Sequence, residues 1–329
     1  MFRFLFKLIA LVLLVVAGWL GWALLLPAKP SEAKFVMLHP GWSTRRIARE
    51  LKNAGVIRSS NAFLLVHHAD ARKVLKAGEY KFDQPANALQ IRERLARGDI
   101  YTHTVVVPEG YNMFDIARVV EQAGLGKADE FLKIAREQTV LVRNIDPQAK
   151  SLEGYLFPDT YQFTRTQSMT DIVSAMVHRF ERESAALGLR ADVHRLVTLA
   201  SIIEKETSVP EERPLVSSVY YNRLAKNIAL AADPTIVYAA LIEGRYRGTI
   251  YVSDLQYDSP YNTYKYAGLP PGPIANPGRE SLKAAMSPAQ TDYYYFVAEG
   301  ATGRHKFSNS YDEHQRNVLA YRRATGGSR

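Results

Sequence analysis

An uncharged and mostly apolar run, Leu8–Ala28, is the feature that most restricts how this chain can fold. It is long enough to cross a membrane, because about 20 apolar residues in a helix span the hydrocarbon core. Arg3 and Lys7 precede the run, and Trp19 and Trp22 lie toward its far end. Basic residues favour the cytoplasmic side and tryptophans the interfaces. We therefore expect a membrane anchor with its N-terminus in the cytoplasm.

A cleaved signal peptide is the competing interpretation of this run. The run is longer than the apolar segment of a typical signal peptide, and no convincing small-x-small cleavage site follows it. We therefore favour an uncleaved anchor within residues 1–30. The rest of the chain has no comparable stretch and should form a soluble body on the far side of the membrane.

Composition excludes several classes of site. The chain has 329 residues, enough for two or three domains, and 47% of them are hydrophobic. It contains no cysteine, which removes disulfides, thiolate metal sites and cysteine nucleophiles. The net charge of +9 favours anionic surfaces such as lipid headgroups or wall polymers. The basic residues are scattered rather than clustered, so we expect no nucleic-acid partner.

A strand followed by an amphipathic helix recurs in the N-terminal half. The first copy has a strand at Lys34–Leu38 and a helix at Thr44–Ala54, with Ile47, Ala48 and Leu51 predicted to face inward. The other copies are Thr104–Val107 with Met113–Ala123 and, less regular, Gly78–Phe82 with Ala88–Leu95. Such modules resemble polysaccharide-binding units, although a simple α+β packing unit explains them equally well.

The stretch LASIIEKETS, Leu199–Ser208, places carboxylates on an otherwise apolar helix. At about 100° per residue, Glu206 falls on the apolar side of that helix, about 60° from Ile203, and Lys205 points away. A carboxyl held against apolar neighbours has a raised pKa and can donate a proton near neutral pH. The alternative is a glutamate at a helix end whose carboxylate reaches water.

Other catalytic signatures are missing from the sequence. There is no GxxxxGK loop, GxGxxG fingerprint, HExxH motif or GxSxG elbow, so we expect no metal and no cofactor. What remains is acidic residues among tyrosines, asparagines and glycines. Aromatic faces with amide and carboxyl groups suit a sugar-binding groove, because sugar rings stack on aromatic rings and their hydroxyls need fixed partners.

From Glu153 onward the chain closely resembles the endolytic murein transglycosylase (MltG, or YceG-like) family. The matching stretches, in the family's order, are EGYLFPDTY, LASIIEKET, SSVYYNRL, DPTIVYA, YNTYKYAGLPPGPIANPG, SLKAAMSPAQTDYYYFVA and HKFS. The resemblance implies an α+β fold with a single N-terminal transmembrane helix. It divides the chain into a stub and anchor at 1–30, a LysM-like strand–helix region at 31–103, a connecting module at 104–150 and a catalytic domain at 151–329.

The resemblance also implies an activity. Family members cleave peptidoglycan glycan strands between N-acetylmuramic acid and N-acetylglucosamine and leave a 1,6-anhydro end. The family's catalytic glutamate is the second in IIEKE, which is Glu206 here and is also the residue that the helical geometry selects. A single acid/base suffices because the attacking hydroxyl is intramolecular, whereas a water-using muramidase needs a second carboxylate. Glu153, Asp159, Glu204 and Asp233 keep that alternative open.

Eight further residues are expected to line the groove: Glu153, Tyr155, Asp159, Asn222, Asp233, Tyr261, Asn262 and Tyr264. Each could instead be structural. Gly268–Gly272 is expected to form a rigid groove wall. One departure stands out, since the family usually carries glutamine and then serine or threonine where this chain has Ala231 and Ala232. That departure leaves a non-catalytic glycan-binding scaffold as a further alternative.

The implied location is the bacterial inner membrane, with Leu8–Ala28 as a single span and the bulk of the chain periplasmic. The implied partners are peptidoglycan glycan strands and penicillin-binding synthases, although no residue shows the latter.

Overall fold

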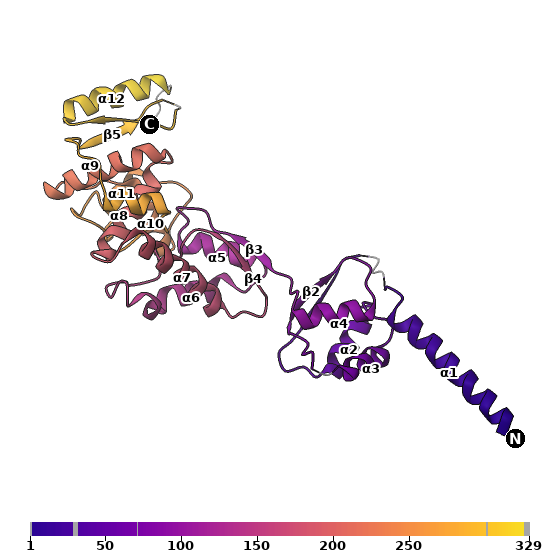
Figure 1. Ribbon diagram of the computed structural model, residues 1–329. Coiled ribbons are helices and arrows are strands. Elements are labelled where there is room, and N and C mark those ends of the chain that lie inside the picture. The colour runs from indigo at the N-terminus through magenta and orange to yellow at the C-terminus, as the bar shows by residue number, and fades with distance from the viewer. Residues whose placement is uncertain (1, 29–31, 71, 301, 326–329) are drawn as a thin grey trace. The chain divides into compact units, whose positions relative to one another are not determined.

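The computed structural model describes residues 2–28, 32–70, 72–300 and 302–325 (Figure 1). The chain divides into two compact units. Unit 1 comprises residues 1–104 and 162–168, and unit 2 comprises residues 105–161 and 169–329. Strands and helices are both present, which confirms the predicted mixed fold class. The four-part division expected above stays a prediction, and residues 105–161 fall in the same unit as most of the remaining chain.

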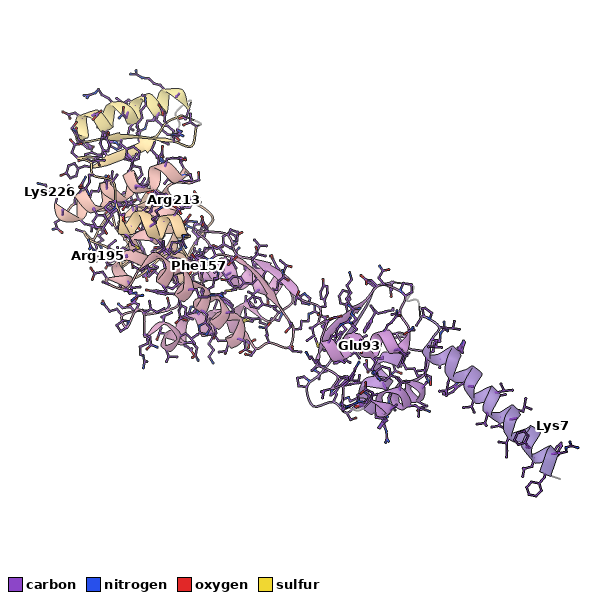
Figure 2. All side chains as sticks on the ribbon, in the orientation of Figure 1. Lys7, Glu93, Phe157, Arg195, Arg213 and Lys226 are labelled. Carbon is purple, nitrogen blue, oxygen red and sulfur yellow. The ribbon has the colours of Figure 1, made fainter. Side chains whose placement is uncertain are left out.

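Helix α1, Phe2–Leu24, is the one described helix that is long and apolar enough to cross a membrane, with a mean hydropathy of 2.4. It begins before the predicted run and ends before Pro27, which has no backbone N–H to continue a helix. Its side chains project on all sides, with Lys7 near its free end (Figure 2). Such all-round exposure of apolar residues is what a lipid-facing helix requires.

Unit 1 contains strand β1 (Lys34–Leu38), helices α2 (Thr44–Asn53) and α3 (Ser60–Ala69), strand β2 (Gly78–Phe82) and helix α4 (Ala88–Arg97). The two strands pair antiparallel, with Val36 opposite Tyr80. The first and third copies of the predicted repeat therefore complete one small sheet and are not separate modules. Helices α2 and α3 lie between the paired strands in chain order. The LysM-like assignment stays a prediction.

The apolar periodicity of α2 predicted its inward face correctly, since Ile47, Ala48 and Leu51 are all buried. The side chain of Ser43 caps this helix by accepting a hydrogen bond from the N–H of Arg46. Ile47, Ala48 and Leu51 pack with residues of both strands and of α4 in the core of unit 1. Helix α3 was not predicted.

Strands β3 (His103–Val106) and β4 (Thr160–Phe163) form a second two-stranded sheet whose residues belong partly to each unit. Strand β4 was not predicted from the sequence. Gly41 and Gly110, which precede α2 and α5 at the same spacing, both adopt positive φ values of 79° and 77°. The shared spacing therefore reflects the same left-handed turn before each helix.

Unit 2 is mainly helical. Its α-helices are α5 (Met113–Gln122), α6 (Ala128–Glu137), α7 (Met169–Leu187), α8 (Val193–Glu206), α9 (Arg213–Ala225), α10 (Asp233–Ile242), α11 (Arg279–Met286) and α12 (Tyr311–Ala324). Single 3₁₀ turns occur at Thr139–Val142, Pro210–Glu212 and Val252–Gln256, and strands β5 (Tyr295–Ala298) and β6 (His305–Ser308) form an antiparallel hairpin. Helix α8 packs against α9, α10 and α11, and its residues from Val197 to Ile203 are all buried.

Candidate active site

Glu206 is the last residue of α8. The helix stops because Thr207 adopts an extended conformation, with φ −139° and ψ 133°. Burial raises the pKa of Glu206 to about 7, and the charge of Asp233 acts in the same direction. A hydrogen bond from Tyr220 and the charge of Arg223 oppose this rise. A carboxyl with such a pKa holds a proton at neutral pH in an appreciable fraction of molecules and can also release it.

Glu204 lies two residues before Glu206 and has a structural role. Its carboxylate forms an ion pair with Arg213 at 3.0 Å and accepts a hydrogen bond from the N–H of Gly278 at 2.9 Å. Both side chains of the pair are nearly inaccessible to solvent, with exposed fractions of 8% for Arg213 and 5% for Glu204. Of the two glutamates in the stretch, Glu206 is therefore the one that is free to exchange a proton with a ligand.

Two residues beside Glu206 were missed by the sequence analysis. Tyr220 is 1% exposed, and Arg223 is held by the carbonyl oxygens of Tyr294 and Leu230, both at 2.7 Å. Both side chains come from the same face of α9, because they are three residues apart in a helix. Their spacing within SSVYYNRL is the signal that could have found them, once α9 was known to pack on α8.

Asp233 and Tyr264 are two exposed residues that interact electrostatically with Glu206. The hydroxyl of Tyr264 donates to Oδ1 of Asp233 at 2.5 Å, and both side chains are exposed. The charge of Asp233 raises the pKa of Glu206, and the charge of Glu206 is one of the causes that raise the pKa of Tyr264. These two predicted site residues are therefore near the candidate acid.

Glu153 and Tyr155 lie inside unit 2, with exposed fractions of 1% and 0%. The Glu153 carboxyl accepts hydrogen bonds from the N–H of Met113 at 3.0 Å and from Nδ2 of Asn276 at 2.8 Å. Burial raises its pKa to about 8, against hydrogen bonds from Met113 and Tyr238. The Tyr155 hydroxyl donates to Asp146. Neither side chain faces a surface open to a polymer in this structure.

Four other predicted groove residues bind protein groups. Asn222 donates to the carbonyl oxygens of Thr291 and Tyr293, both at 2.9 Å. Asn262 is 1% exposed and donates to the carbonyl of Tyr257 at 2.7 Å. The remaining contacts are an ion pair of Asp159 with Arg179 at 2.5 Å and a ring contact of Tyr261 with Tyr238 at 5.1 Å. Their roles in substrate binding stay predictions.

The segment from Pro271 to Gly278 follows α8 along its length. His194 bonds the carbonyl of Pro271 at 3.0 Å through Nε2, and the hydroxyl of Ser201 accepts from the N–H of Ile274 at 3.0 Å. With the bond from Gly278 to Glu204, the segment is attached to α8 at three positions. The region expected as a groove wall is therefore fastened to the helix that carries Glu206.

Ala231 and Ala232, where the chain departs from the family pattern, precede α10. Ala231 has a positive φ of 49°, and Ala232 is 2% exposed and occupies the N-cap without a side-chain hydrogen bond. The hydroxyl of Thr263 accepts a hydrogen bond from the N–H of Ala232 at 3.0 Å, so this buried backbone group just before α10 is satisfied. The methyl group of Ala232 faces the protein interior, so its departure affects the helix end rather than an exposed groove surface.

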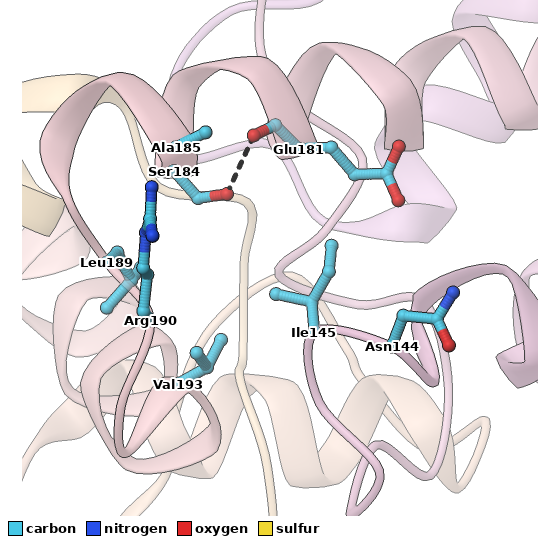
Figure 3. Close-up of a pocket in the computed structure, with 8 residues that line it drawn as sticks. All are labelled: Asn144, Ile145, Glu181, Ser184, Ala185, Leu189, Arg190 and Val193. Carbon is cyan, nitrogen blue, oxygen red and sulfur yellow. Dashed lines mark hydrogen bonds between the residues drawn. The ribbon is translucent and has the colours of Figure 1, made fainter.

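A cavity of about 280 Å³ adjoins the C-terminal end of α8. It is lined by Asn112, Lys205, Asp233, Pro234, Val237, Tyr238, Leu241 and Ile274. A second pocket of about 260 Å³ lies between the end of α7 and the start of α8 (Figure 3) and contains none of the predicted site residues. No group of three or more histidines and acidic residues suited to a metal occurs in the described part of the chain.

These features place the chain in a family of known proteins. It belongs to the YceG-like family, whose model matches residues 36–320. The endolytic murein transglycosylase of Bacillus subtilis (strain 168) is 34% identical over 318 residues, which cover 90% of this chain and 87% of that protein. The enzyme of the same name from Streptococcus pneumoniae is 28% identical, over 95% of this chain and 64% of its own length.

A solved structure agrees with this assignment. The crystal structure of a YceG-like protein from Listeria monocytogenes is 33% identical to this chain and superposes with a TM-score of 0.57, over 87% of this chain and 99% of the other. The family resemblance stated from the motifs is therefore confirmed.

Proposed function

We propose that this protein is a membrane-anchored lytic transglycosylase that cleaves peptidoglycan glycan strands internally, with Glu206 as its single acid/base. The names of the Bacillus and Streptococcus relatives support the reaction class. The observation that carries the assignment of Glu206 is its combination of a raised pKa, partial access to solvent and, among the described residues, no ion pair, in contrast to Glu204.

The reaction follows from one carboxyl group acting twice. Glu206 gives its proton to the glycosidic oxygen as the bond from that oxygen to C1 of the muramic acid sugar breaks. The resulting carboxylate then takes the proton of the C6 hydroxyl, whose oxygen forms the new bond to C1. No water is consumed, and Glu206 ends protonated as it began. Tyr220 and Arg223 stabilise the carboxylate between the two steps.

A water-using muramidase is the second candidate, because Asp233 offers an exposed carboxylate whose charge acts on Glu206. In that reaction Asp233 would activate a water and the product would carry a reducing end. The hydrogen bond from Tyr264 to Asp233 disfavours this role, since it occupies Oδ1, one of the two oxygens that would have to accept the proton of the water.

The location is proposed from α1. Helix α1 would hold the protein in the bacterial inner membrane, with the basic residues Arg3 and Lys7 on the cytoplasmic side and both folded units in the periplasm. Peptidoglycan strands would then lie within reach of unit 2. Penicillin-binding synthases, which elongate the same strands, are the protein partners that this location favours.

The test is mass spectrometry of uncrosslinked glycan strands after incubation with the full-length protein in detergent. We expect 1,6-anhydro ends from the wild type and none from Glu206→Gln. The control is Glu211→Gln, which changes an exposed glutamate shortly after Glu206 in the chain and should leave the 1,6-anhydro ends unchanged. Reducing ends would instead identify a muramidase. Strands that bind but stay intact with the wild type would identify a scaffold.

A further inference from the structure

The cavity beside Glu206 has an apolar interior. Four of its eight lining residues, Pro234, Val237, Leu241 and Ile274, are apolar, and the exposed carboxylate of Asp233 lies at its edge. The side chain of Asn112, which also lines it, is already occupied, because its oxygen caps α5 by accepting from the N–H groups of Phe114 and Asp115, both at 3.0 Å. A ligand in this space would therefore place methyl or methylene groups against the wall.

Lys205 supplies a positive charge at the same cavity. It is exposed, and its ammonium group donates to the carbonyl of Gly110 at 3.2 Å. Among the described residues it forms no ion pair with a carboxylate, whereas Arg213 nearby is buried and paired with Glu204. An ammonium group has three N–H donors, so Lys205 has capacity left for an anionic or carbonyl oxygen.

The size of the cavity restricts what it can hold. Pockets for drug-sized ligands enclose roughly 300 to 1,000 Å³, and this one measures about 280 Å³. It is therefore suited to a substituent of a sugar rather than to a disaccharide. Its position is also restricted, because Lys205 immediately precedes Glu206 and Asp233 acts on the Glu206 carboxyl.

We propose that this cavity binds the carboxyl-bearing substituent of muramic acid, with Lys205 binding a carboxylate and the apolar wall contacting the adjacent methyl group. Muramic acid differs from glucosamine by a lactyl ether, which carries one methyl and one carboxyl group. This inference rests on the proposed function and adds which substituent of the sugar the site recognises. Binding this substituent beside Glu206 would select the bond at C1 of muramic acid and exclude the alternate bond along the strand.

The carboxylate could come from two sources. In strands without peptides it is the lactyl carboxylate itself. In strands with peptide stems the lactyl carboxyl is an amide, and the carboxylate belongs to the stem. In both cases the substituent of the muramic acid sugar carries a methyl group and a carboxylate, so the chemistry is shared and the substrates can be compared directly.

The experiment measures kcat and KM of full-length protein in detergent on uncrosslinked strands, with and without stems. We expect Lys205→Gln to lower kcat/KM about tenfold or more, mainly through KM, because a hydrogen bond to a charged group is lost. Lys205→Arg should restore most of the loss, because it keeps the charge. Lys133→Gln, an exposed lysine on α6, is the matched control and should have no effect.

The substrate on which Lys205→Gln acts identifies the source of the carboxylate. A loss confined to stem-free strands assigns the lactyl carboxylate, and a loss confined to stem-bearing strands assigns the stem. Unchanged kinetics on both substrates would overturn the proposal. A loss that Lys205→Arg fails to restore, together with a lowered melting temperature, would also overturn it, because it would indicate a structural role.

Binding separates this inference from the proposed function. Affinity for intact strands is measured for Glu206→Gln and for Glu206→Gln combined with Lys205→Gln. We expect the second variant to bind about tenfold more weakly. This readout needs no cleavage, so the cavity could be confirmed even if the protein proved to be a scaffold, and it could fail while the transglycosylase activity stood.

A steric variant tests the apolar wall independently of charge. Val237 is half-buried at the cavity, and Val237→Phe would fill part of the space. We expect a raised KM for strands with an unchanged melting temperature. Unchanged KM with a correctly folded Val237→Phe variant would show that the substituent does not enter the cavity.

Discussion

Glu153 and Glu206 mark two regions of unit 2 in which burial raises the pKa of a carboxyl, to about 8 and about 7 respectively. In the first region the carboxyl is enclosed, with donors from Met113, Asn276 and Tyr238. In the second the carboxyl stands at a helix end beside a cavity and exposed polar groups. A raised pKa alone therefore does not identify a catalytic acid, because access to a ligand is also required.

The strongest contrast between the two regions is in catalysis. Glu206→Gln should lower the rate of strand cleavage by about 10²- to 10⁴-fold, the usual contribution of a general acid. Below pH 4.5 the melting temperature should hardly change, because the amide matches the protonated carboxyl in size and charge, and at neutral pH it should rise, because the variant lacks the stability loss caused by ionising Glu206. Cleavage is measured by the release of soluble fragments. Substantial residual activity would mean that another group supplies the proton.

The Glu153 region should respond in stability instead. Glu153→Ala leaves the buried N–H of Met113 and the amide of Asn276 without an acceptor, so we expect a loss of about 3 kcal/mol in the free energy of unfolding. Denaturant unfolding measures it. Glu211→Ala, at an exposed glutamate, should change stability by less than about 0.5 kcal/mol. A stable Glu153→Ala variant that has lost only activity would place Glu153 in the reaction.

The pH dependence should separate the two carboxyls further. The proposed reaction requires a proton on Glu206, so kcat/KM should fall as the pH rises through about 7. Both folded-state pKa values lie above the ordinary value of 4.5, so each contributes stability that is complete below pH 4.5 and is lost as the pH rises through about 7 or about 8.

The matched variants resolve the two contributions. Glu206→Gln should remove the loss that Glu206 contributes between about pH 4.5 and about pH 7 and leave the loss from Glu153, which continues to about pH 8. The measurement is urea unfolding of both proteins between pH 5 and pH 9. Identical pH profiles for the variant and the wild type would contradict the raised pKa of Glu206.

The smallest expected effect concerns the backbone next to the Glu206 region. Ala231 has a left-handed φ of 49°, which costs a residue with a Cβ roughly 1–2 kcal/mol. Ala231→Gly relieves this strain but makes the unfolded chain more flexible, so the net gain should be about 0.5–1 kcal/mol. Thermal unfolding measures it. If cleavage falls while stability rises, the strained turn contributes to the position of Asp233.

The elements that the sequence predicted well are those with strong local periodicity. The inward face at Ile47, Ala48 and Leu51 in α2 is buried as predicted, and α5 forms within one residue of the predicted helix Met113–Ala123. The missed elements lack such patterns. Helix α3, SNAFLLVHHA, is apolar with two histidines and no clear stripe, and β4 is only four residues long and pairs with a strand far away in the chain.

The candidate site was predictable where one helix determined it. Periodicity in α8 selected Glu206, and its pKa is raised as that argument required. Tyr220 and Arg223 depend on how α9 packs against α8, which no local pattern contains. Glu153 was expected in a groove, but its environment depends on Met113 and Asn276, which are distant in sequence. The sequence identified Glu153 as a candidate carboxyl group but did not predict that it is buried.

The three attachments of the Pro271–Gly278 segment to α8 have a mechanical consequence. The last residue of a helix is ordinarily the first to fray, and Glu206 holds that position. Attachments at His194, Ser201 and Glu204 span nearly the whole helix, so its end cannot bend without displacing the segment as well. In the proposed reaction, a long and tethered polymer that pulled on the site would load the helix and the segment together, so Glu206 would keep its position relative to the bond that breaks.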